Sequence, residues 1–209
     1  MLTIEMDNFD LGQICRSGQC FRMEQTGENS YRVIAGDKYL ELTQEKGIVN
    51  FFCPEEDFIS FWIRYFDLDC DYQQYIERIN PRDRYLTEAV KLGNGIRILQ
   101  QDLWEMIITF LISQQNNITR IKRCIENISR EFGEKKISSN GIEYYAFPTP
   151  QSLSQAGEEQ LKACNLGYRA KYVLDTARKT ASGEISLNEI RDMKYKDAQI
   201  GRASCRERV

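Results

Sequence analysis

The feature that most constrains the fold of this chain is a change in the spacing of its apolar residues. Up to residue 52, short segments rich in β-branched and aromatic side chains are separated by turn signals that contain Gly27, Gly36 and Gly47. Beyond Pro54, apolar residues recur at helical spacing instead. This order predicts an α+β fold, with an antiparallel sheet of consecutive hairpins first and a helical part after it.

The predicted elements are strands over 21–24, 31–34, 39–42 and 48–52, and helices after Pro54, over 103–112, over 118–132, after Thr149-Pro150 and over 166–183. The segment 103–112 is apolar nearly all round, which is typical of a buried central helix. The helix 118–132 places isoleucines on one face and basic residues elsewhere, and it begins after a polar run.

The composition excludes several kinds of catalytic site. The chain has no histidine, which removes Ser-His-Asp and Cys-His triads and every histidine-ligated metal site. Its seven cysteines are scattered and never spaced as C-x-x-C, so they predict neither a disulfide framework nor a zinc site. We therefore expect no metal and no cofactor. The longest apolar run is too short for the ~20 residues of a membrane span, and the acidic N-terminus does not resemble a secretory signal.

The charge is unevenly distributed along the chain. The net charge is −3, and residues 1–100 carry 11 basic and 17 acidic side chains, against 14 and 13 in residues 101–199. A surface that binds an anion is therefore expected in the second half, where local basic clusters must provide the attraction.

Several segments, in this order, resemble the 8-oxoguanine DNA glycosylase family, a branch of the helix-hairpin-helix (HhH-GPD) glycosylases. They are 17–22 (SGQCFR), 95–102 (GIRILQQD), 113–120 (SQQNNITR) and 166–172 (LGYRAKY). The resemblance implies a sheet domain like that of the TATA-binding protein over 1–98, and the first part of a helical HhH-GPD domain over 99–199. Residues 200–209 (IGRASCRERV) have no apolar periodicity, and one back-translation resembles a sequencing adapter, so we interpret them as a non-native tail.

An enzyme that acts on a base inside a duplex must flip the base out of the stack and then recognise it. The resemblance implies that Gly18, Gln19 and Phe21 recognise the lesion. The backbone carbonyl of Gly18 would accept a hydrogen bond from N7–H, the donor that 8-oxoguanine has and guanine lacks. Taken without the resemblance, Gly18 is a turn residue ahead of a strand.

The flipped base leaves a gap and an orphaned cytosine. The resemblance implies that residues of two loops fill this gap, contact the cytosine and wedge the duplex open: Gln115, Asn116, Asn117, Arg120, Tyr168 and Arg169. The family usually has asparagine where Gln115 stands, and tryptophan is commoner than Met23. Without the resemblance, helix capping by the asparagines, solvated arginines and a core tyrosine would also explain these residues.

The family's nucleophilic lysine follows an L-x-G-V-G turn, and a catalytic aspartate lies further on; together they give base excision with strand cleavage (AP-lyase activity). This sequence contains no such turn, so Lys194 and Lys196 are assigned no catalytic role and the chain is expected to be an inactive, C-terminally truncated part of the enzyme.

The expected partner is double-stranded DNA that contains oxidised guanine, bound by a monomer without any membrane contact. The expected location is the cytoplasm of a bacterium, with the nucleoid, or the nucleus of a eukaryote. Two alternatives stay open: an alkylpurine DNA glycosylase of the same superfamily, and a non-catalytic DNA-binding module with a similar sheet.

Overall fold

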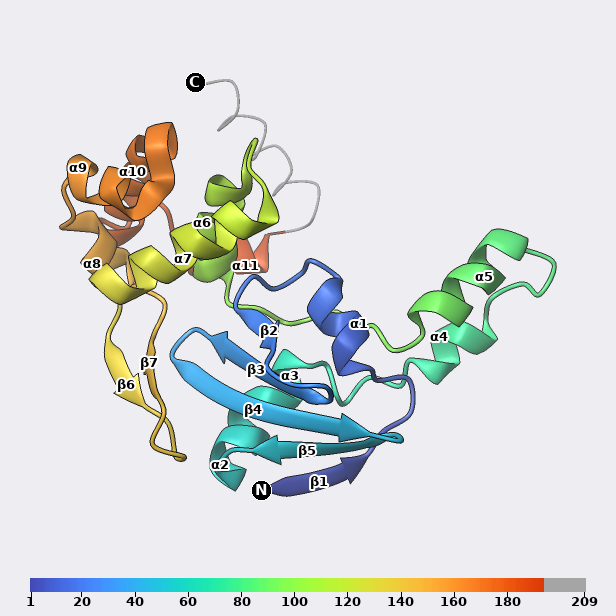
Figure 1. Ribbon diagram of the computed structural model, residues 1–209. Coiled ribbons are helices and arrows are strands. Elements are labelled where there is room, and N and C mark those ends of the chain that lie inside the picture. The colour runs from blue at the N-terminus through green and yellow to red at the C-terminus, as the bar shows by residue number, and fades with distance from the viewer. Residues whose placement is uncertain (194–209) are drawn as a thin grey trace.

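A computed structural model describes residues 1–193 of the chain. It confirms the predicted α+β fold class: an antiparallel sheet with several helices around it, followed by a helical part (Figure 1). The predicted tail over 200–209, together with Lys194 and Lys196, lies outside the described residues.

The sheet has five strands in the order β1-β5-β4-β3-β2, and all neighbours are antiparallel. The strands are β1 (Leu2–Glu5), β2 (Met23–Gln25), β3 (Ser30–Ala35), β4 (Lys38–Glu45) and β5 (Ile48–Phe52). The predicted run of consecutive hairpins is confirmed from β2 to β5. In β3 the side chains of Tyr31, Val33 and Ala35 alternate into the core, as the period of two requires.

Two short elements near the N-terminus were not predicted. Strand β1 pairs with β5, with Leu2 opposite Phe51. Helix α1 (Leu11–Arg16) is capped by Asp10, whose Oδ1 accepts a hydrogen bond from the backbone N–H of Gln13 at 2.8 Å. Both are too short for a reliable periodic signal.

The predicted helix after Pro54 is present, and it packs aromatic side chains on the sheet. It comprises α2 (Glu55–Asp57), the wider turn η1 (Phe58–Trp62) and α3 (Ile63–Tyr65). The ring centroids of Phe51 and Phe58 lie 5.0 Å apart in an edge-to-face contact, and Trp62 and Phe66 are fully buried beside them. These side chains form the core of the sheet domain.

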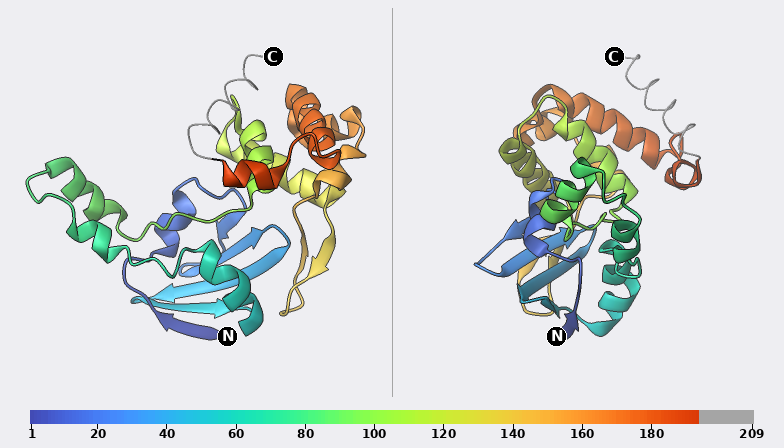
Figure 2. Two further views of the ribbon diagram at one scale, coloured as in Figure 1. Left: turned by 180° about the vertical axis from the view of Figure 1, so that it is seen from behind. Right: turned by 90° about the vertical axis from the view of Figure 1, so that its right-hand side faces the viewer.

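Helices α4 (Gln73–Glu77) and α5 (Arg84–Gly93) project away from the sheet as a pair (Figures 1 and 2). Neither helix contains a buried residue. Neither was predicted.

The second core lies in the helical part. Its helices are α6 (Leu103–Ser113), α7 (Ile118–Phe132), α8 (Pro150–Ser154), α9 (Glu158–Leu161), η2 (Lys162–Leu166), η3 (Gly167–Arg169), α10 (Ala170–Ala181) and α11 (Leu187–Asp192). The helices predicted over 103–112, over 118–132 and after Thr149-Pro150 are confirmed. The helix predicted from residue 166 begins only at Ala170, because Asn165 and Gly167 adopt positive φ values of 68° and 59°. None of the helices within residues 1–193 has the length and apolar character needed to cross a membrane.

A hairpin of β6 (Lys135–Ile137) and β7 (Glu143–Tyr145) extends from the helical part to the side of the sheet (Figure 1). Nζ of Lys136 lies 2.8 Å from Oδ2 of Asp37, and the hydroxyl of Tyr144 donates to the Asp37 carbonyl at 2.8 Å. Just beyond the hairpin, the N–H of Phe147 donates to the carbonyl of Gly36 at 2.8 Å. The hairpin therefore attaches the helical part to the turn between β3 and β4.

Candidate nucleic-acid interface

The segment 17–22 joins α1 to β2, and the side chain of Gln19 anchors it. Nε2 of Gln19 donates to the carbonyl of Arg97 at 2.9 Å, and Oε1 accepts from the N–H of Leu99 at 3.0 Å. Nε2 of Gln101 donates to the Gln19 carbonyl at 2.7 Å. The Gln19 amide therefore pairs with the backbone ahead of α6 and fixes the segment against it.

Gly18 is exposed and has a φ of +78°, a conformation that glycine adopts without strain. No atom lies within 4 Å of the position that a Cβ would occupy there. The backbone at Gly18 is therefore open to an approaching group. Phe21 is half-buried and packs against the helical core. The three residues predicted to recognise the lesion thus lie together, but Gly18 alone presents an exposed, open backbone.

The predicted gap-filling residues lie in the loop between α6 and α7. Gln115 adopts a φ of +47°, which turns the chain sharply. Nδ2 of Asn116 donates to the carbonyl of Ile112 at 2.9 Å, and Oδ1 of Asn117 accepts from the N–H of Arg120 at 2.9 Å. Asn117 is thus the N-cap of α7, as the alternative interpretation proposed, and the side chain of Gln115 is exposed at the turn.

The loop that precedes α10 lies against this turn. The hydroxyl of Tyr168 donates to the carbonyl of Gln114 at 3.5 Å, and Tyr168 is 54% exposed. Arg169 is only 3% exposed, and its Nε and Nη2 donate to the same carbonyl at 2.9 and 2.5 Å. Nη2 also donates to the carbonyl of Gln115 at 2.8 Å. Two loops separated by more than fifty residues therefore form one surface.

The two predicted arginines occupy different environments. Arg120 is exposed, and its Nη2 lies 3.5 Å from the carbonyl of Asn165. Arg169 is buried, and its guanidinium carbon lies 4.5 Å from the centre of the Tyr168 ring. Arg169 therefore supports the loop in this structure, whereas Arg120 faces outward; a contact of either with a cytosine stays a prediction.

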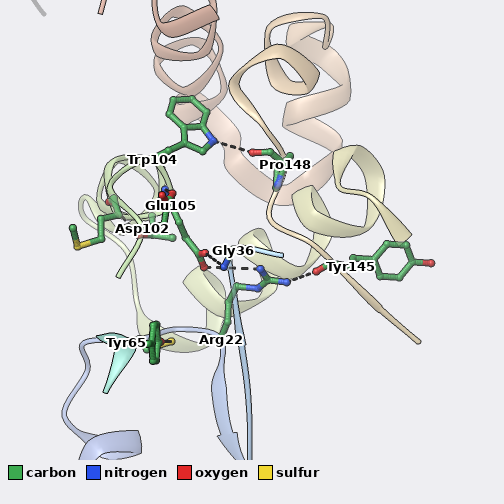
Figure 3. Close-up of polar contacts among 11 residues, drawn as sticks. Arg22, Gly36, Tyr65, Asp102, Trp104, Glu105, Tyr145 and Pro148 are labelled. Atoms are coloured by element: carbon green, nitrogen blue, oxygen red, sulfur yellow. Dashed lines mark hydrogen bonds and ion pairs between the residues drawn. The ribbon is translucent and has the colours of Figure 1, made fainter. Parts of the chain in front are cut away.

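A buried ion pair that was not predicted connects Arg22, the last residue of the segment 17–22, with Glu105 of α6 (Figure 3). Nη1 of Arg22 lies 3.9 Å from Oε1 of Glu105, and the N–H of Gly36 donates to Oε2 of Glu105 at 2.8 Å. Burial raises the pKa of the Glu105 carboxyl, while Arg22 and the Gly36 N–H oppose that shift. The sequence carried a signal for this site, because Glu105 interrupts an otherwise apolar helix.

Neighbouring groups add polarity beneath the same segment. The hydroxyl of Tyr65 donates to Sγ of Cys20 at 3.4 Å, and burial raises the pKa of both groups.

Within residues 1–193, no three histidine, cysteine or carboxylate side chains are grouped to hold a metal ion.

The family follows from comparison with family models. Residues 1–107 match the N-terminal domain of 8-oxoguanine DNA glycosylase, and residues 108–208 match the HhH-GPD superfamily of base excision DNA repair proteins. The chain belongs to the 8-oxoguanine DNA glycosylase family. The resemblance seen in the sequence is thereby confirmed. The two models meet between residues 107 and 108, and the second extends through most of the predicted tail.

The relatives of this chain extend well beyond the matched region. The N-glycosylase/DNA lyase of Saccharomyces cerevisiae is 32% identical over 219 residues, which cover 95% of this chain and 58% of the yeast protein. The apo crystal structure of the Clostridium acetobutylicum 8-oxoguanine glycosylase/lyase has a TM-score of 0.87 at 37% identity, covering 93% of this chain and 68% of that one. The chain thus spans little more than half the length of its yeast relative.

Two further solved structures share the fold of this chain. The same clostridial enzyme in complex with double-stranded DNA that contains cytosine opposite 8-oxoguanine has a TM-score of 0.85 at 38% identity, covering 91% of this chain and 66% of that one. The 3-methyladenine DNA glycosylase of Archaeoglobus fulgidus has a TM-score of 0.71 at 18% identity, covering 98% and 74%. The alkylpurine enzyme therefore shares the fold of this 8-oxoguanine glycosylase-family chain.

Proposed function

We propose that this chain provides the lesion-recognition and duplex-opening parts of a DNA glycosylase that removes 8-oxoguanine from duplex DNA and has AP-lyase activity. The observation that carries the proposal is the single surface formed by the loops 114–120 and 165–169, with Gln115, Arg120 and Tyr168 exposed on it. A flipped base leaves a gap of the kind that such side chains fill.

Chemistry at each position supports this assignment. An exposed arginine beside a polar turn suits hydrogen bonding to the edge of an orphaned base, and a half-exposed tyrosine suits a wedge between stacked bases. The open backbone at Gly18 suits close approach of a purine. The related clostridial enzyme, bound to double-stranded DNA that contains cytosine opposite 8-oxoguanine, supports the choice of substrate.

An assay of strand cleavage tests the proposal that the 209-residue polypeptide is inactive. No L-x-G-V-G turn followed by lysine occurs in its sequence, so nucleophilic attack on the sugar C1′ has no assigned residue. We expect no cutting of an end-labelled duplex with 8-oxoguanine opposite cytosine. The full-length clostridial enzyme serves as the positive control, and cutting above background by the purified chain contradicts the proposed inactivity.

The alkylpurine alternative is favoured less, because 37–38% identity to the 8-oxoguanine enzyme contrasts with 18% to the 3-methyladenine enzyme. Competition binding separates the two. Preference for 8-oxoguanine over an alkylated purine supports the proposal, preference for the alkylated purine supports the alternative, and equal binding to intact DNA supports a non-catalytic module. The protein is proposed to act as a monomer, in the compartment that holds the genome.

A further inference from the structure

The ion pair of Arg22 and Glu105 connects the segment 17–22 with helix α6. Arg22 is the last residue of that segment, and Glu105 lies in the first turn of α6. The two side chains are only 5% and 9% exposed, although both are charged groups. A buried arginine four residues from Gly18 therefore has its counter-charge on another element, 83 positions along the chain.

Glu105 and Arg22 each also make a hydrogen bond to the backbone of another segment (Figure 3). Oε2 of Glu105 accepts from the N–H of Gly36, in the turn between β3 and β4. Nη2 of Arg22 donates to the carbonyl of Tyr145, at the end of β7. The guanidinium carbon also lies 6.0 Å from the centre of the Phe147 ring. The pair thus joins the sheet, helix α6 and the β6–β7 hairpin at one point.

This arrangement is a costly way to stabilise a fold. Burial of two charges carries a desolvation penalty that their attraction offsets only partly, and apolar residues of similar size often serve as well. The structure leaves Nη1 of Arg22 buried without a hydrogen-bond partner, at 3.9 Å from the carboxylate. The directional contacts are at the two outer ends of the pair, where Oε2 of Glu105 accepts from the Gly36 N–H and Nη2 of Arg22 donates to the Tyr145 carbonyl, because a hydrogen bond tolerates only a narrow range of positions.

Helix α6 links Glu105 to the second loop of the interface, the turn at Gln114 and Gln115. It is unbroken from Leu103 to Ser113, and the turn at Gln114 and Gln115 follows directly. The rise of ~1.5 Å per residue places Ser113 about 12 Å along the axis from Glu105. A shift of Glu105 therefore moves the turn that carries Gln115, while Arg22 holds the segment that carries Gly18.

We propose that Arg22 is a positioning residue, which acts through Glu105 to fix the distance between the lesion-recognition segment 17–22 and the orphan-base turn at 114–117. The inference rests on the proposed function. Arg22 touches no base in this account. It sets the separation at which one loop can hold a flipped purine while the other occupies the gap.

The first test uses the free 209-residue chain and needs no DNA. Amide ¹H–¹⁵N spectra are compared for wild type, Arg22→Gln and Glu105→Gln, with Arg130→Gln and Glu126→Gln as matched controls from an exposed pair within α7. The proposal predicts that both junction variants shift the amides of 17–22 together with those of 114–117. The controls are expected to leave both loops unchanged. A shift confined to 17–22 in Arg22→Gln overturns the proposal.

The second test measures lesion discrimination as the ratio of the dissociation constants for guanine and 8-oxoguanine, each opposite cytosine. Arg22→Gln is expected to lower this ratio at least fivefold while the constant for undamaged duplex changes less than twofold. A uniform loss of binding contradicts a positioning role. If the ratio of dissociation constants is near one for the wild type, the proposed function is contradicted instead. The comparison of amide spectra then still tests the positioning role.

Arg22→Lys replaces Arg22→Gln in both tests if Arg22→Gln does not fold. It retains the charge but not the planar fork, so it is expected to fold and to show intermediate shifts in both loops. Wild-type spectra and wild-type discrimination from Arg22→Lys, with a folded chain, would show that guanidinium geometry at this position is not needed and would overturn the proposal.

Discussion

Arg169 donates hydrogen bonds from Nε and Nη2 to one carbonyl oxygen, that of Gln114, although the two residues are 55 positions apart. This buried arginine joins the loop before α10 to the turn after α6. Its neighbour in the proposed interface, Arg120, is exposed. The two arginines that the sequence assigned to one task therefore differ in what they contribute to the folded protein.

Replacement of each arginine by alanine separates these contributions. Arg169→Ala removes the charge-assisted hydrogen bonds to the carbonyls of Gln114 and Gln115, so the free energy of unfolding is expected to fall by about 2–4 kcal/mol. Arg120→Ala is expected to change it by less than about 0.5 kcal/mol, because the side chain is at the surface. Urea denaturation followed by circular dichroism measures both. Equal effects of the two substitutions would contradict the assignment.

Gly18→Ala tests whether an open backbone at that position serves recognition. Gly18 and Gly141 have nearly equal φ values of +78° and +79°, and at neither position does an atom lie within 4 Å of an added Cβ. Each alanine is therefore expected to cost about 1 kcal/mol in folding. Only Gly18→Ala is expected to weaken binding to an 8-oxoguanine duplex, measured by fluorescence anisotropy. Loss of binding in Gly141→Ala to the same degree would argue against a role specific to Gly18.

Gln19→Ala tests the anchor of the same segment. The substitution leaves the Arg97 carbonyl and the Leu99 N–H without their side-chain partner, so a loss of about 1–3 kcal/mol in the free energy of unfolding is expected. Gln25→Ala is the control, because its amide donates only to an exposed turn carbonyl at Glu28. Thermal denaturation that ranks Gln25→Ala as the more damaging change would refute the anchoring role.

The buried carboxyl of Glu105 predicts a specific pH dependence. Burial raises its pKa in the folded protein above the ordinary value of 4.5, although the Arg22 guanidinium and the Gly36 N–H pull it down, and Asp102 adds to the rise. The folded state therefore holds this proton more tightly than the unfolded state. The resulting stability is complete below pH 4.5 and is lost as the pH rises through the folded-state pKa.

The comparison of wild type with Glu105→Gln isolates this effect, since other carboxylates titrate equally in both. The free energy of unfolding of wild type, minus that of Glu105→Gln, is expected to decrease as the pH rises from 4.5 to 7. Urea denaturation at several pH values measures the difference. A difference that grows with pH would mean that Arg22 lowers the pKa below its ordinary value.

The fold could be predicted where local signals and packing agree. Turn residues between β-branched segments identified the hairpins from β2 to β5, and helical spacing identified α6 and α7. Helix α5 was not predicted, although Leu86, Ala89 and Val90 recur at helical spacing. These residues face Tyr75 and Ile76 of α4 and none of them is buried, so this helix joins neither core. The β6–β7 hairpin over 135–145 was not predicted, because its strands have three residues each and are stabilised by contacts with Asp37.

The candidate site divides in the same way. The segments that contain Gly18, Gln115 and Tyr168 could be found by family resemblance, since their motifs are contiguous in the chain. The burial of Arg169 could not, because it depends on a loop more than fifty residues away. The pairing of Arg22 with Glu105 likewise depends on the way the hairpin and α6 meet the sheet.

Lesion-selective binding is the measurement that tests the central claim most directly. The purified 209-residue chain is titrated into two otherwise identical labelled duplexes, one with 8-oxoguanine and one with guanine opposite the same cytosine, and the dissociation constants are compared. Tighter binding to the oxidised duplex is predicted, without strand scission. Equal affinity for both duplexes would contradict the account.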